Sequence, residues 1–436
     1  MLRKRLQLAL IHVAVAMTLV PINSTLNRVM IKELALSATL VSILAVLPYL
    51  FSPIQVAIGA YADKHPIFGY RRTPYILLGL ILTVAGLALA PAVVYVMPGN
   101  FALGLLLSVL VFGAWGMGYN FASVSYLSLA SELSGEKERS KTIAIMFFFM
   151  IIGIIFTSVG LSSLLETYSP EIIQTSFLVV AGIALALGLI GLIKLEPRQT
   201  TPSRDISKED RTPWNVMIKE VFASSQVKSF FIYLAILLAA ILGQDVLLEP
   251  FGAEAFGLSV QATTRITSIW GTCMLIALVL ASFLERWTSK KKVAFISAWI
   301  AMLGFVLITI SGFMRSTNIF YSGVVFLGLG TGASTTSNLS LMLDMTTTRV
   351  GLFIGAWGVA NAISRFIGTL MSGVIRDVAS NVLNNAVYGY LVVFSIQVLM
   401  LVVSVWLLQK IDVSSFKKQV VHLNLQEKAA LFNEVA

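Results

Sequence analysis

Long apolar runs separated by short polar gaps fill most of this chain. A helix needs about 20 apolar residues to cross a hydrocarbon core of roughly 30 Å, and the runs have that length. The pattern therefore predicts an all-α integral membrane protein with twelve transmembrane helices. The expected spans are 8 to 29, 38 to 62, 73 to 95, 101 to 129, 141 to 163, 172 to 194, 229 to 250, 261 to 284, 293 to 313, 319 to 343, 351 to 375 and 387 to 409.

Basic residues fall into every second gap between these runs, and short cytoplasmic loops are the ones that retain lysine and arginine. This alternation predicts that both termini are cytoplasmic. A composition of 57% hydrophobic and 12% charged residues agrees that lipid surrounds most of the chain. The net charge of +10 is then a topology signal that faces anionic lipid, and we expect no nucleic-acid partner.

One long polar interruption divides the chain into two sets of six spans. It contains Pro197, Pro202 and Pro213 and shows no sign of a fold of its own. Acids and bases recur at matching loop positions in the two sets, which suggests duplication of a six-helix unit. The expected units are an N-terminal six-helix bundle (1–195), a cytoplasmic linker (196–228), a C-terminal six-helix bundle (229–410) and a cytoplasmic tail (411–436), which is either an amphipathic surface helix or a loose segment.

The loop after the second span resembles a motif of the major facilitator superfamily. Its residues are Gly59, Asp63, Gly69, Arg71 and Arg72, although the second glycine comes three positions late. In that family the aspartate contacts the eleventh helix and the basic residues of the loop, a charge-assisted contact that breaks during rocking. A solvated turn of mixed charge is the alternative. The resemblance implies the two-bundle fold of that superfamily.

Three further stretches resemble the PucC/LhaA group, the bacteriochlorophyll-delivery branch of the same superfamily. They are residues 25–34, 243–260 and 351–368, and the resemblance extends over essentially the whole chain. It implies an assembly factor for light-harvesting or photosystem complexes that handles chlorophyll or bacteriochlorophyll. It also implies a photosynthetic membrane and antenna subunits, photosystem subunits or pigment-synthesis proteins as partners. Cyanobacteria carry such proteins too.

In a facilitator fold, helices one, four, seven and ten line a central cavity, and their polar residues at mid-depth are substrate candidates. These candidates are Asn23, Tyr119, Asn120, Gln244 and Asn338. None of them is ionisable at neutral pH, and the nearest carboxyl groups, those of Asp245 and Glu249, are expected in the outer third, so proton-driven transport has little support. The alternative function, a secondary transporter of an amphipathic small molecule, nevertheless stays open beside assembly.

Several charged residues lie inside the expected spans. Arg28 and Asp245 should share one depth in the outer third, because each lies some 25 Å along its helix. We therefore expect Arg28 and Arg265 to pair with Asp245 and Glu249 and to close the non-cytoplasmic side; the alternative is that each side chain snorkels to the interface. Arg365, 14 residues into helix eleven, must face protein or water. Its partner is a pigment carboxylate, another subunit or a residue of the bundle.

Catalytic and metal-binding motifs are not evident in the sequence. The glycines sit in apolar runs, no triad or aspartate-rich motif is present, and the single cysteine, Cys273, builds neither a disulfide nor a thiolate metal cluster. We therefore predict a protein that is not an enzyme and has no metal site of its own. His12 is the one intramembrane histidine that could ligate a chlorophyll magnesium, and a hydrogen-bonded histidine is the alternative.

Overall fold

In the computed structural model the described residues are 2–51, 54, 58, 61–62, 65–198, 225–344 and 350–411. Within these ranges the regular elements are helices, apart from an isolated β-bridge between Ile67 and Tyr70. Ten helices in this part of the chain are long and apolar enough to cross a membrane. The predicted class, an all-helical membrane protein, is confirmed.

The N-terminal group of helices begins with an unusual first span. Here α1 (Leu2–Ala16) is followed by two π-helical stretches, η1 (Pro21–Leu26) and η2 (Val29–Glu33), a rare geometry that is frequent at functional sites. The expected fourth and fifth spans form one element, α5 (Phe101–Leu164), with a kink at Gly135, where φ is 66°. The other helices of this group are α2 (Ala38–Leu50), α4 (Thr73–Val94) and α6 (Pro170–Leu192).

The C-terminal group begins with a discontinuous span. Its first part, α8 (Ser225–Leu242), ends before a five-residue turn, and α9 (Leu248–Phe256) continues toward the same side. The other helices of this group are α10 (Val260–Leu284), α11 (Lys290–Met314), α12 (Thr317–Asp344), α13 (Val350–Val382) and α14 (Ala386–Lys410). All twelve expected spans therefore coincide with helical segments, although α2 covers only the first part of span 38 to 62.

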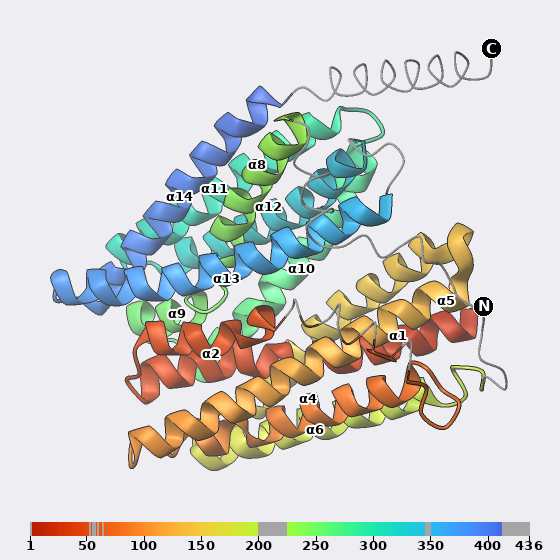
Figure 1. The fold of residues 1–436 in the computed structure, drawn as a ribbon. Helices are drawn as coiled ribbons and strands as arrows, with labels where there is room; N and C mark the ends of the chain where they lie inside the picture. The colour runs from red at the N-terminus through yellow and green to blue at the C-terminus, as the bar shows by residue number, and fades with distance from the viewer. Residues whose placement is uncertain are drawn as a thin grey trace.

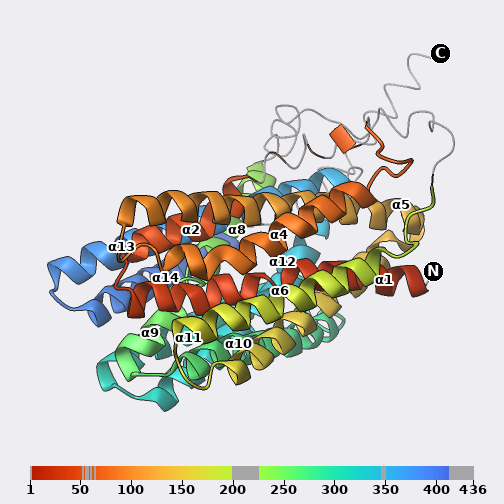
Figure 2. The same cartoon turned by 90° about the horizontal axis from the view of Figure 1, so that it is seen from below.

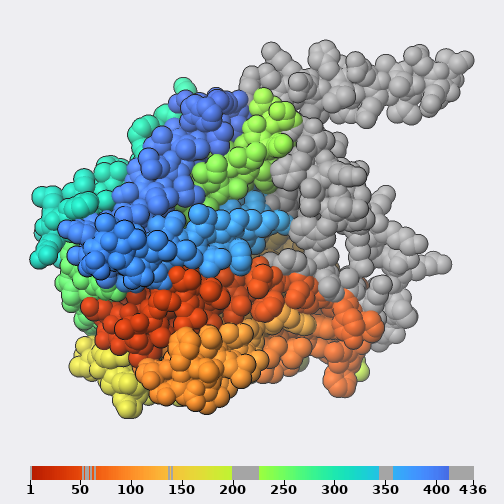
Figure 3. All heavy atoms as spheres, turned by 60° about the vertical axis from the view of Figure 1, so that its left-hand side comes forward, coloured from red at the N-terminus to blue at the C-terminus, as the bar shows by residue number. Residues whose placement is uncertain are grey.

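The two groups lie one above the other in Figure 1, and Figure 2 shows the N-terminal group from below. They meet where α2 packs against α13 and α5 against α10. We call the end of the molecule opposite the start of α1 the distal end; α9 lies at this end, on the left in Figure 1. Figure 3 brings the left-hand side of Figure 1 forward, and in this view the red atoms of the first 50 residues lie against the blue atoms of α13.

Glycines bring neighbouring helices into close contact inside each group. A Cβ at Gly332 of α12 would lie 2.0 Å from the backbone oxygen of Met274 in α10, and one at Gly79 of α4 would lie 2.4 Å from the backbone nitrogen of Ala122 in α5. Helices in lipid associate through such packing, since the hydrophobic effect provides little drive there. Side-chain caps start several helices, as expected for serine and asparagine; they are Ser37, Asn100, Ser169, Ser259, Ser289 and Asn385.

Candidate functional site

An ion pair lies near the middle of the membrane-spanning part. Arg365 comes 15 residues after the start of α13, about 22 Å along a helix of about 50 Å. Its Nη1 lies 2.7 Å from Asp245 Oδ2, and the two side chains keep 27% and 20% of their surface exposed. Arg365 thus pairs with a residue of the bundle, which is one of the three alternatives that the sequence left open. The residual exposure leaves both charged groups accessible to a ligand.

The broken seventh span places Asp245 at this depth. Because α8 ends at Leu242, the residues of the turn that follows do not keep helical geometry, and their side chains can point toward α13. Gly243 makes that approach possible, since a Cβ there would lie 2.9 Å from the backbone oxygen of Gly368 in α13. Discontinuous spans at mid-membrane are a recurring way to build binding sites in transporter folds.

Aromatic and amide groups from both helix groups surround this ion pair. The hydroxyl of Tyr49 in α2 lies 3.1 Å from Arg365 Nη1, and the Tyr49 ring centroid lies 5.2 Å from the guanidinium carbon. Tyr119 of α5 interacts electrostatically with both residues. Gln244 Nε2 donates to Asp245 Oδ1 at 3.0 Å. We call these five residues the central cluster; it offers hydrogen-bond donors, an acceptor and aromatic faces to an amphipathic molecule.

The predicted pairing of Arg28 and Arg265 with Asp245 and Glu249 is wrong in its partners. Arg28 binds Glu33 at 2.5 Å. These residues are five apart in π-helical backbone, whose wider turn brings such positions together. Arg28 also donates to the backbone oxygen of Leu258 at 3.2 Å, and Arg265 donates to Ser162 at 3.0 Å.

Glu249 is bound by hydroxyl groups instead of an arginine. Its Oε1 is hydrogen-bonded to Ser24 at 2.5 Å and to Thr267 at 2.7 Å, while its Oε2 has no partner among the described residues. Ser24 belongs to η1 and Thr267 to α10, so the carboxyl group joins the two helix groups. The residue is only 4% exposed.

The distal end is closed by further hydrogen bonds between the two groups. The Asp377 carboxylate of α13 accepts the backbone N–H groups of Ala38 and Thr39 at 3.0 and 2.7 Å, at the positively polarised start of α2. Arg376 holds this carboxylate at 3.0 Å and binds Glu254 at 3.0 Å. Other contacts between the groups at this end are Thr25 with Thr264, Ser158 with the Thr264 carbonyl and Ser162 with the Gln261 carbonyl. Closure of this end was expected; Arg28, Arg265 and Glu249 take part in it through other partners than predicted.

The candidate cavity residues have different environments. Asn120 donates to the carbonyls of Pro48 and Gly116, and Asn338 accepts from Tyr233 and donates to Ser334. Both asparagines are 1% exposed and therefore bind neighbouring helices. Asn23 Oδ1 and Gln244 Oε1 are buried without a partner in the described structure. Tyr119 and Gln244 are the candidates that join the central cluster; the roles of all five in binding stay predictions.

The motif of the second loop is described only in part. Gly59 and Asp63 lie outside the described residues, as do residues 199–224 of the linker and 412–436 of the tail. Gly69 has a φ of 81°, which only glycine adopts without strain. Arg72 binds Glu132 at 2.8 Å.

His12 lies deep between aromatic rings. It is 3% exposed, and the ring centroids of Tyr126 and Phe147 lie 5.1 and 4.9 Å from its own. The Nδ1 atom has no partner in the part of the chain that is described. Two rings and this burial leave no open face for a macrocycle in this conformation, so the residues here do not fit a pigment. A pigment ligand at His12 stays a prediction.

The model of the PUCC protein family matches residues 25–416. The chain belongs to the PucC family. Protein PucC of Cereibacter sphaeroides is 31% identical over 414 residues, which cover 91% of this chain and 89% of that protein. The bacteriochlorophyll synthase 44.5 kDa chain of Rhodobacter capsulatus is 26% identical and covers 91% of this chain and 92% of its own length.

Among solved structures, the crystal structure of the nucleoside transporter NupG matches this PucC-family chain with a TM-score of 0.70. The identity is 15%, and the match covers 94% of this chain and 98% of NupG. At this identity the match shows the fold alone. It confirms the predicted major facilitator fold.

Several residues of these sites in the PucC-family chain were missed from the sequence. Tyr49 gave no signal, since a tyrosine in an apolar run is common in membrane helices. Asp377 and Arg376 stand next to each other near the end of a span, which signals a local ion pair but not its partner on α2. Glu196 accepts hydrogen bonds from the N–H groups of Arg72 and Thr73 at the start of α4. From the sequence, a glutamate at the first position of a polar linker would be expected to face water.

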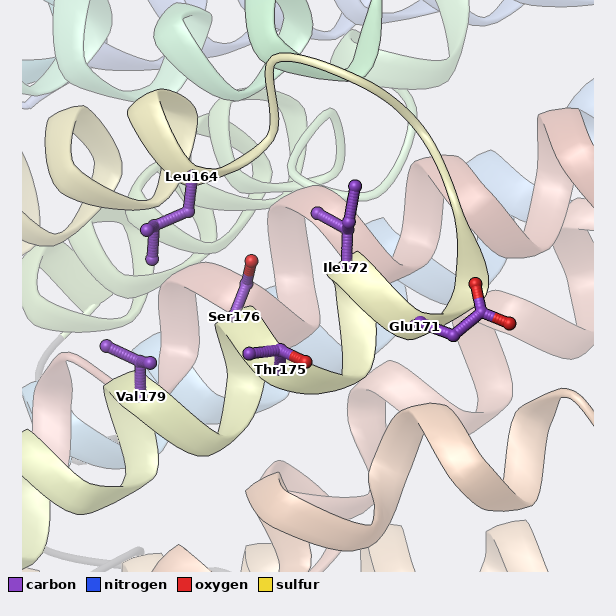
Figure 4. A pocket seen from close by; sticks show the side chains of 6 residues that line it. All are labelled: Leu164, Glu171, Ile172, Thr175, Ser176 and Val179. Carbon is purple, nitrogen blue, oxygen red and sulfur yellow. The ribbon is translucent and has the colours of Figure 1, made fainter.

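A shallow hollow of about 260 Å³ lies at the distal end, between the end of α5 and the first turns of α6. Figure 4 shows the side chains around it; they are Leu164, Glu171, Ile172, Thr175, Ser176 and Val179. The hollow opens on the outside of the N-terminal group, away from the central cluster. It therefore adds nothing to the candidate site.

Proposed function

We propose that this protein is a non-enzymatic membrane assembly factor for light-harvesting or photosystem complexes and that it handles chlorophyll or bacteriochlorophyll as cargo. Membership of the PucC family supports this role, as does the similarity to Protein PucC and to the bacteriochlorophyll synthase 44.5 kDa chain. The alternation of basic gaps supports cytoplasmic termini, and the family supports a photosynthetic membrane. The division into two six-helix bundles joined by a linker belongs to the same proposal.

The partly exposed ion pair of the central cluster is the observation that carries the proposal. Arg365 would donate to a carbonyl or carboxylate on the edge of a planar ring, next to the side chains of Tyr49 and Tyr119. Asp245 keeps Arg365 charged and aligned when no cargo is bound. Antenna subunits, photosystem subunits or pigment-synthesis proteins are the partners that would deliver or receive the pigment.

The test is an absorption spectrum of the protein purified gently from its native membrane, together with the identity of co-purifying bands. We expect bound pigment and an antenna or photosystem polypeptide with the wild type and with Arg286→Gln, a matched arginine next to Phe283 outside the central cluster. Arg365→Gln should keep its fold and lose the pigment. A colourless, partner-free wild type would contradict the proposal.

A secondary transporter of an amphipathic small molecule is the second candidate. The broken seventh span, with Gln244 and Asp245 at mid-membrane, favours it, because such breaks form substrate sites in transporters. Flux of a small amphipathic molecule into liposomes that contain only this protein would support transport. No flux, combined with co-purifying pigment, would support assembly.

A further inference from the structure

We propose that Glu249 is a proton-binding site and that its proton holds the distal end closed. This inference goes beyond the proposed function, because it concerns a group that no step of cargo binding uses. The carboxyl group lies between η1 of the N-terminal group and α9 and α10 of the C-terminal group. Whatever changes its charge therefore changes the contact between the two groups.

The hydrogen bonds of Glu249 fit a carboxylic acid better than a carboxylate. Both hydroxyl partners, Ser24 and Thr267, bind Oε1, while Oε2 is buried without a partner among the described residues. A proton on Oε1 is donated to Ser24 Oγ, and Oε2 is then a carbonyl oxygen. Burying a carbonyl oxygen without a hydrogen bond costs less free energy than burying an oxygen of a carboxylate anion in the same way. An ionised carboxylate in this position would have hydroxyl donors on one oxygen only and no cation bound to it, although buried charges require such partners.

The charged groups around Glu249 bind other partners. Arg28 is the cation that acts on it electrostatically, but its Nη1 and Nη2 atoms bind Glu33 and the Leu258 carbonyl, and its buried Nε has no partner among the described residues. The elements in contact with α9 are α10, α14 and η2, α12 through Phe320, and α13 through Arg376, which binds Glu254 and Asp377. The other titratable groups of these elements toward this end are Lys32 and Glu33, both exposed, Arg265, which donates to Ser162, Tyr321, Tyr388, and Tyr390, whose hydroxyl donates to Glu254.

Loss of the proton therefore favours opening. An anion at Glu249 needs donors for Oε2, and water reaches that atom when Ser24 moves away from Thr267. These residues lie on opposite groups, so hydrating the anion separates the groups at the distal end. The proton leaves to water and returns from water, and no other reactant is needed.

The experiment measures the separation of the two groups as a function of pH. Spin labels are placed on Phe101→Cys and Met314→Cys, two exposed positions at the distal ends of α5 and α11, in a full-length protein with Cys273→Ser. The protein is held in lipid nanodiscs, so both ends meet the same buffer. We expect the distance between the labels to lengthen as pH rises. A pair within one group, Phe101→Cys with Tyr168→Cys, should show no change.

Two variants separate the proposal from a general effect of pH. Glu249→Gln is permanently neutral and should keep the short distance at every pH. Thr267→Val removes one hydroxyl donor from the anion and should move the midpoint to higher pH without abolishing the transition, which keeps the test valid if Glu249→Gln does not fold. The proposal is overturned if Glu249→Gln opens like the wild type, if Thr267→Val leaves the midpoint unchanged, or if sodium at constant pH produces the change.

Discussion

Replacing Asp245 by Asn removes the negative partner of Arg365 and keeps the size of the side chain. In the wild type the two charges lie 2.7 Å apart, and about a quarter or less of each side chain is exposed. In Asp245→Asn, Arg365 keeps the Tyr49 hydroxyl at 3.1 Å and the Tyr49 ring at 5.2 Å. The substitution therefore isolates the contribution of the opposite charge.

The expected loss follows from the position of Arg365. An arginine without a counter-charge at the centre of a spanning helix costs about 3 kcal/mol. The cation–π contact with Tyr49, which is partly desolvated, offsets about 1 kcal/mol of that cost. The free energy of unfolding should fall by about 2 kcal/mol, which lowers the folded-to-unfolded ratio roughly 30-fold.

Unfolding of the purified protein in mixed micelles with rising SDS, followed by the fluorescence of its seven tryptophans, measures this loss. Arg365→Gln should be destabilised as well, and the double variant should lose less than the sum of the two single losses, since both charges are then absent. Glu138→Gln, which removes an exposed partner of Arg5, is the control and should change little. Additive losses, or a wild-type-like Asp245→Asn, would refute the structural role of this pair.

Three further predictions concern packing, capping and pH. Gly332→Ala should lower the free energy of unfolding by about 1 to 3 kcal/mol, because its Cβ meets the Met274 backbone; Gly182→Ala, with nothing within 4 Å, should be neutral or slightly stabilising in the same SDS titration, and equal effects would contradict the packing. Asp377→Ala should lose about 2 to 3 kcal/mol, since three hydrogen bonds to Ala38 and Thr39 disappear, whereas Asp377→Asn keeps one acceptor oxygen and should lose less; the same loss in both would argue against capping. The hydrogen bond and charge of Arg5 lower the pKa of Glu138, so this pair contributes stability above the ordinary glutamate pKa and loses it as pH falls through the lowered value; thermal unfolding between pH 7 and 3 should show a smaller acid loss for Glu138→Gln, and identical pH profiles would exclude the pair as a cause.

The existence of the central cluster could be predicted in part from the sequence. Arg365 and Asp245 stood out because charged residues inside apolar runs are expensive and need partners. Their mutual pairing could not be predicted, since depth along a helix gives one coordinate and the direction of a side chain around the helix depends on local winding. Two π-helical stretches rotate Arg28 toward Glu33, and the break after Leu242 directs Asp245 toward α13.

The contacts that close the distal end could likewise be predicted only in part from the sequence. Glu249 and Arg28 were expected at this end from their depth, but hydroxyl groups of Ser24 and Thr267 bind the carboxyl group. Serine and threonine occur throughout apolar helices and usually bond to their own backbone, so the sequence offers no sign of which of them cross to another helix. Asp377 escaped notice because the donors to its carboxylate are backbone N–H groups, which every residue but proline carries.

By itself the sequence determined that lipid surrounds most of this protein, the order of its helices, its major facilitator fold and its PucC family. Apolar length, basic gaps and extended motifs are read along one dimension, and the bilayer imposes the same rule on every chain. Only the tertiary structure decided which charges meet, which end is closed and which carboxyl group lacks a counter-ion. Those features depend on the angles at which helices face one another, and packing between two groups distant in sequence sets these angles.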